Sequence, residues 1–152
     1  LTAVPTLAFV YLRTIPKVPT SFAATAWIPL GLVGQSTAGA QLLAGEQWHF
    51  RAMVYGVAML GLGIPLAIYA ISKHWGAALG STPMSYKPTW WASTFPVGTC
   101  CLGTHTLSTQ PAALALGMGW MDNISAALLV LLLVHVMWAT IGAAVIGWIK
   151  AR

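Results

Sequence analysis

Residues 90–107 read WWASTFPVGTCCLGTHTL, and this stretch decides how the chain folds. It is apolar enough to lie in a bilayer, yet it carries several hydroxyl side chains, one proline and two glycines. A simple membrane anchor would carry leucines there. Small residues leave space beside a helix, and a proline loosens the backbone hydrogen-bond ladder. The stretch therefore predicts a transmembrane helix that lines a path, with Phe95 as its most conspicuous side chain.

The composition extends this interpretation to the whole chain. Of the 152 residues, 58% are hydrophobic and only 6% are charged, whereas soluble domains carry about a quarter charged residues. An all-α integral membrane protein is predicted, because several apolar runs can cross a hydrocarbon core of roughly 30 Å as helices. The basic residues behind the net charge of +5 are scattered singly, which argues against nucleic acid as a partner.

Apolar runs divide the chain into a single transmembrane domain. The predicted spans are residues 1–12, 21–44, 53–71, 89–107 and 124–149. The first run is too short to span, so we expect a truncated helix and a sequence that is the C-terminal part of a longer protein. If the C-terminus is cytoplasmic, all Lys and Arg residues except Arg51 lie on the cytoplasmic side, as membrane proteins prefer.

The spans 21–44 and 89–107 echo each other. Each carries a tryptophan, then a Pro-x-Gly group at Pro29 or Pro96, then further glycines among small and polar residues. The other two complete spans are plainer. This pattern predicts helical hairpins that each pair a small-residue inner helix with a more apolar outer helix, an organisation typical of transporters.

One face of each inner helix is predicted to line the path. At about 100° per residue, Phe95 shares a stripe with small and hydroxyl residues, and we expect its ring to close the path as a hydrophobic gate. The alternative is that Phe95 packs against a neighbouring helix and the glycines only allow close packing. The residues predicted to line the pore are Pro29, Gly31, Gly34, Gln35, Pro96, Gly98, Thr99, Leu102 and Thr106.

The polar residues inside the spans suggest further roles. Gln35 either donates to a passing anion or ties two helices together, and the tie is slightly favoured. His105 is a candidate for a proton-linked step, because imidazole titrates near neutral pH, or it lies in the interface. His105 and His135 also suggest an alternative function, a redox subunit with bis-histidine haem. Nothing else supports haem, so no cofactor or metal is predicted.

Catalytic chemistry is not indicated. The sequence shows no nucleophile–base pair, carboxylate pair or phosphate-binding loop, so an enzyme is not predicted. Cys100 and Cys101 are adjacent, so they point about 100° apart on a helix and are expected to be small packing residues.

Two motifs resemble those of a known family. Trp90-Trp91-x-x-Thr94-Phe95-Pro96-x-Gly98 is similar to the ninth-helix motif of the tellurite-resistance/dicarboxylate transporter family. That family includes slow-type anion channels, malate permeases and sulfite efflux pumps. Residues 27–36, WIPLGLVGQS, resemble its seventh-helix motif, notably the Gly34-Gln35 pair.

The resemblance carries several implications. It implies a fold of ten helices in five hairpins, of which this chain covers the end of helix six through helix ten. It further implies odd-numbered helices around a pore in each protomer of a homotrimer, cytoplasmic termini in the cell membrane, pore kinks at Pro29 and Pro96, and a pore occluded by Phe95. The predicted function is therefore transmembrane transport of small anions such as malate, sulfite or chloride, with lipid as the other partner. The motifs leave open which anion is carried.

Overall fold

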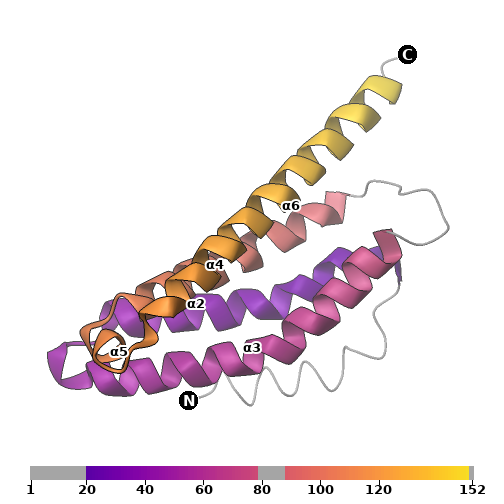
Figure 1. Ribbon diagram of the computed structural model, residues 1–152. Helices are drawn as coiled ribbons and strands as arrows, with labels where there is room; N and C mark the ends of the chain where they lie inside the picture. Colours follow the sequence, from indigo (N-terminus) through magenta and orange to yellow (C-terminus); the bar gives the residue numbers. More distant parts are fainter. Residues whose placement is uncertain (1–19, 79–87, 151–152) are drawn as a thin grey trace.

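The computed structural model describes residues 20–78 and 88–150, and within these ranges every regular element is helical (Figure 1). The prediction of an all-α fold is thereby confirmed. The truncated helix predicted at residues 1–12 lies outside the described residues.

Four α-helices form the body of the structure, joined or preceded by shorter helical segments. The α-helices are α2 (Ile28–Leu43), α3 (His49–Ala78), α4 (Thr94–Ser108) and α6 (Met121–Lys150), with a short α5 (Pro111–Ala115). The 3-10 segments are η2 (Thr20–Trp27), η3 (Glu46–Trp48), η4 (Pro88–Ser93) and η5 (Met118–Trp120). The helix α3 begins before the predicted span 53–71 and extends beyond its end.

Two of these helical runs are long and apolar enough to cross a membrane. They are residues 46–75 and 118–149, which contain most of α3 and α6. The helices α2 and α4 are shorter, but each continues directly from a 3-10 segment, so each pair of segments forms one longer helical run.

The helices pack in the order α3, α2, α4, α6. The most extensive contact joins α2 to α4, while α3 packs on α2 and α6 packs on α4. The C-terminal half of α6, drawn in yellow, projects beyond the other described helices (Figure 1). This is the expected arrangement of hairpins, with the small-residue helices inside and the more apolar ones outside.

A hydrophobic core fills the space where α2, α3 and α4 meet. Its buried side chains include Trp27, Val33, Met59 and Val97. These are exposed by at most 2% of their surface, so the described part of the chain is held together around the α2–α4 pair.

The two prolines lie at equivalent places. Pro29 is in the first turn of α2 and Pro96 is in the first turn of α4, each just after a 3-10 segment. Because each α-helix continues from a 3-10 segment, each proline removes a backbone donor from a continuous helical run close to the place where its geometry changes. The irregularity expected from each proline therefore takes the form of a change from 3-10 to α geometry.

Candidate functional site

The helices α2 and α4 run side by side with their glycines in register. A Cβ atom built on Gly34 would overlap the backbone of Thr99 and Cys100. A Cβ atom built on Gly103 would lie 2.7 Å from the carbonyl oxygen of Gly34. Neither position can hold a side chain unless the helices separate, so Gly34 and Gly103 bring the two backbones into contact.

Polar groups bridge the same contact. The Thr99 hydroxyl lies 3.4 Å from the Gly31 carbonyl oxygen and also donates to the Pro96 carbonyl at 3.0 Å. The Cys100 thiol donates to the Leu30 carbonyl at 3.3 Å. These carbonyls belong to the first turns of α2 and α4, where the prolines interrupt regular pairing. The α2–α4 contact is therefore both tight and polar around the two prolines.

One face of the α2–α4 pair is left uncovered by the described residues, and we call it the open face. Phe95 is 59% exposed and Leu102 is 49% exposed, and both belong to this face. The Phe95 ring rests against α2, since a Cβ atom on Gly31 would lie 3.1 Å from its Cε1 atom. Gln35 is exposed on α2 as well. The Phe95 ring and the Gln35 amide are thus both accessible on this side of α2 and α4.

The other predicted pore residues divide into two groups. Partly exposed are Pro29, Gly98, Thr99 and Thr106, whereas Gly31, Gly34 and Pro96 are buried. Gly98 faces α6, with the Cδ2 atom of Leu132 3.5 Å from the position of its missing Cβ. Gly34 thus allows α2 and α4 to pack closely. The pore-lining role of the nine predicted residues stays a prediction.

Gln41 makes the helix tie that the sequence suggested for Gln35. The Gln41 side chain is 3% exposed and donates from Nε2 to the carbonyl oxygen of Ala52 in α3 at 2.7 Å. Gly56 leaves room for this amide, because a Cβ atom there would lie 2.8 Å from Nε2. Gln41 is not among the residues predicted from the sequence, although it is also an amide inside the span 21–44.

His105 pairs with Asp122 across the turn between α4 and α6. The distance from Nδ1 to Oδ1 is 2.8 Å, and both side chains are more than half exposed. His135, in contrast, lines a cavity together with Ser93, at the opposite end of α4. Since Ser93 and His105 are separated by roughly 18 Å of helix, the two histidines cannot ligate one haem iron. The geometry does not favour the haem alternative.

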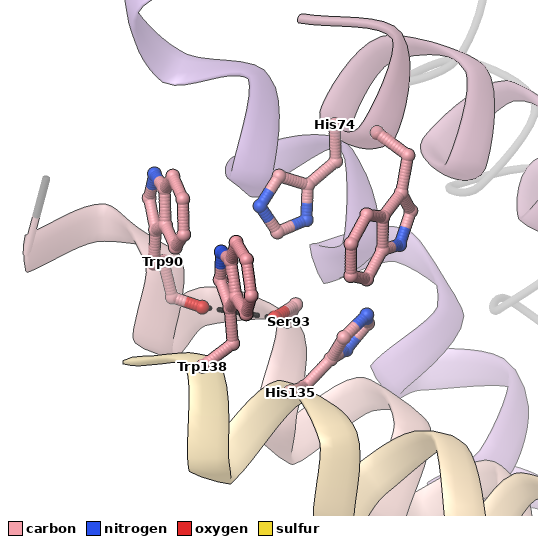
Figure 2. Close-up of a pocket in the computed structure, with 6 residues that line it drawn as sticks. His74, Trp90, Ser93, His135 and Trp138 are labelled. Carbon is pink, nitrogen blue, oxygen red and sulfur yellow. Dashed lines mark hydrogen bonds between the residues drawn. The ribbon is translucent and has the colours of Figure 1, made fainter. Parts of the chain in front are cut away.

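A cluster of rings joins four segments at the end of the bundle where α4 begins, and Figure 2 shows the members that line its cavity. This histidine–tryptophan cluster surrounds a small cavity. Its members are Trp27 of η2, His74 and Trp75 of α3, Trp90 and Ser93 of η4, and His135 and Trp138 of α6. The 3-10 segments η2 and η4 lie directly before Pro29 and Pro96. The cluster packs both segments against the outer helices α3 and α6.

The two histidines of the cluster differ in their partners. The Trp27 indole donates from Nε1 to Nδ1 of His74 at 3.0 Å, so a neutral His74 carries its proton on Nε2. Neither ring nitrogen of His135 makes a well-aligned hydrogen bond among the described residues, although the Ser93 backbone lies close to the ring. Its ring stacks on Trp75 with centroids 5.5 Å apart and meets Trp27 edge-on at 4.9 Å.

The predicted span 53–71 ends before His74, so this histidine was expected to lie in the loop that follows the span. The structure shows it 6% exposed near the end of α3, which continues to Ala78. The polar run Ser72-Lys73-His74 gave no sign that this histidine is buried. Within residues 20–78 and 88–150, no group of three or more His, Cys, Asp or Glu side chains could hold a metal ion.

Comparison with known proteins adds one finding. Residues 1–144 match the model of the family SLAC1, described as voltage-dependent anion channel. No curated protein and no solved structure matches the chain.

Proposed function

Because the chain belongs to the SLAC1 family of voltage-dependent anion channels, we propose that the open face of α2 and α4 lines its anion path and that Phe95 closes this path. The membership predicted from the two motifs is confirmed by the match. The family consists of membrane channels or transporters for anions rather than enzymes.

The position of Phe95 is the observation that supports its proposed role as a gate. Its ring is a large apolar group at the start of the α4 helix, on a face that the described residues leave open, and it rests on Gly31. A glycine offers no side chain to lock the ring, so the ring can turn. A hydrophobic constriction stops ions by excluding water, and a turning ring can remove it.

Gln35 is our proposed donor to the passing anion. The hydroxyls of Thr99 and Thr106 already donate to carbonyls of their own helix, at 3.0 Å each, so they present lone pairs to the open face. The exposed amide of Gln35 has no such partner among the described residues, and amide N–H groups bind anions. Neither α2 nor α4 carries a Lys, Arg, Asp or Glu, so selectivity along this face depends on weak dipoles.

Anion flux in liposomes that carry the full-length protein tests the proposal. Chloride, sulfite and malate are compared, and the preferred anion identifies the substrate class. Phe95→Ala should raise the flux at least several-fold. Leu133→Ala on α6 is the matched control, because Leu133 is also 59% exposed but lies outside the open face. Equal flux in well-folded wild-type and Phe95→Ala protein would remove Phe95 as the gate.

The assembly and placement of the protein belong to the same proposal. We expect a homotrimer in the cell membrane with a cytoplasmic C-terminus, as the family resemblance and the distribution of Lys and Arg suggest. Light scattering of the purified protein measures the oligomer, and a reporter fused to the C-terminus measures its side. A proton-linked role of His105 predicts that His105→Gln abolishes the response of flux to a pH gradient.

A further inference from the structure

An apolar groove lies between the outer helices α3 and α6, with α2 and α4 as its floor. Its volume is about 430 Å³. The walls include Val57, Leu60 and Ile64 on α3 and Ile124, Leu128 and Leu131 on α6.

The groove and the open face lie on opposite sides of α4. Val97, Cys100 and Thr104 belong to the floor of the groove, and they lie roughly 140–200° around the helix from Phe95. The groove is therefore separate from the proposed anion path, and the inference drawn from it does not rest on that path.

Water does not suit this groove. Among its lining residues, the Thr104 hydroxyl already donates to the Cys100 carbonyl at 2.8 Å, and the Cys100 thiol donates to Leu30. An ordered water needs two to four polar partners, whereas apolar cavities stay dry and take apolar ligands.

The groove is longer than one leaflet of a bilayer, so it has room for a whole acyl chain. Along α3 it runs from Val57 to Ile71, roughly 21 Å at the rise of an α-helix. One leaflet of the hydrocarbon core is roughly 15 Å thick. Both walls belong to the two runs that are long and apolar enough to cross a membrane, so the groove opens at the depth of the lipid chains.

We infer that this groove is a binding site for one acyl chain of a membrane phospholipid. The chain lies along α3 and α6 and fills space that the side chains leave empty. It thereby adds a second link between the outer helices α3 and α6, whose ring contacts lie at the end of the bundle in the histidine–tryptophan cluster.

Gly61 offers a way to fill the groove without disturbing the fold. It lines the groove, and no atom lies within 4 Å of the position of its missing Cβ. A leucine there would occupy the volume that the acyl chain needs. Gly147 on α6 is the matched control, because its Cβ position is equally open and it lies outside the groove.

The experiment measures phospholipid bound to the full-length protein. Gly61→Leu and Gly147→Leu variants are purified in detergent, and native mass spectrometry counts the retained phospholipid. In bilayers, phosphatidylcholine spin-labelled on its acyl chain reports the immobilised fraction. We expect Gly61→Leu to lose one tightly held lipid per protomer and Gly147→Leu to retain it.

Two results would overturn the inference. One is equal lipid retention in both variants, with folding confirmed by an unchanged thermal transition. The other is a loss of protomer association in Gly61→Leu with unchanged lipid, which would identify a second copy of the chain as the occupant. Neither result bears on flux through the open face, so the anion proposal is tested separately.

Discussion

Glycines on α2 serve different purposes according to what their missing side chain would meet. At Gly34 a Cβ atom would overlap the α4 backbone, whereas at Gly39 it would meet nothing within 4 Å. We expect Gly34→Ala to destabilise the protein by about 1–3 kcal/mol, because the helices must separate. Gly39→Ala should stabilise it by about 0.5–1 kcal/mol through helix propensity. Thermal unfolding followed by tryptophan fluorescence measures both, and equal effects would contradict the packing argument.

Gly31 bears on the gate rather than on stability. A methyl group there would press on the Phe95 ring from 3.1 Å and push it out of the position in which it closes the path. Such a clash destabilises the closed position by about 0.5–1.5 kcal/mol, so we expect Gly31→Ala to raise anion flux roughly two- to tenfold. In a Phe95→Ala background the same substitution should have no effect on flux. An equal change in both backgrounds would show that Gly31 acts independently of Phe95.

Between elements, the contact of α2 with α3 depends on one amide. Gln41 donates to Ala52 through space that Gly56 leaves free. We expect Gly56→Ala to displace the amide and to cost about 1 kcal/mol, the net value of a typical hydrogen bond, plus the clash. The cost should be smaller in a Gln41→Ala background, which contains no amide to displace. A double-mutant cycle of unfolding free energies measures this coupling, and strict additivity would disprove it.

The elements also show which features the sequence reveals. The repeated Pro-x-Gly pattern predicted two equivalent helices. In the structure α2 and α4 lie side by side, with Pro29 in the first turn of α2 and Pro96 in the first turn of α4. The spacing of glycines could not distinguish packing from pore lining, since both uses favour small residues. The amide tie at Gln41 was missed because its partner is a backbone carbonyl, which leaves no trace in the sequence.

At the scale of the molecule, the histidine–tryptophan cluster joins η2, α3, η4 and α6. His74→Phe would leave the buried Trp27 indole N–H unpaired, so we expect a loss of about 1–3 kcal/mol of unfolding free energy. His135→Phe keeps the ring contacts and removes two buried nitrogens that make no well-aligned hydrogen bond among the described residues, so it should be neutral or stabilising. Thermal unfolding distinguishes the two, and equal losses would mean that His135 has a partner of its own.

The histidine–tryptophan cluster is the part of the whole protein that local residue patterns do not predict. The all-α membrane fold was predicted from the composition and the family from two motifs, because composition and motifs are local properties of the sequence. The burial of His74 depends on α3 continuing past residue 71 and on rings contributed by three other segments. Such an assembly exists only once the helices are packed, and no pattern along the chain predicts it.

The lengths of the outer helices make the protein sensitive to the thickness of its membrane. Residues 124–149 of α6 extend over roughly 39 Å, which exceeds the roughly 30 Å of an average hydrocarbon core. The excess is accommodated by tilting the helix or by stretching the lipids around it, at a cost of fractions of a kcal/mol per Å. Thicker bilayers reduce this hydrophobic mismatch, so the cost falls as the hydrocarbon core approaches the length of α6.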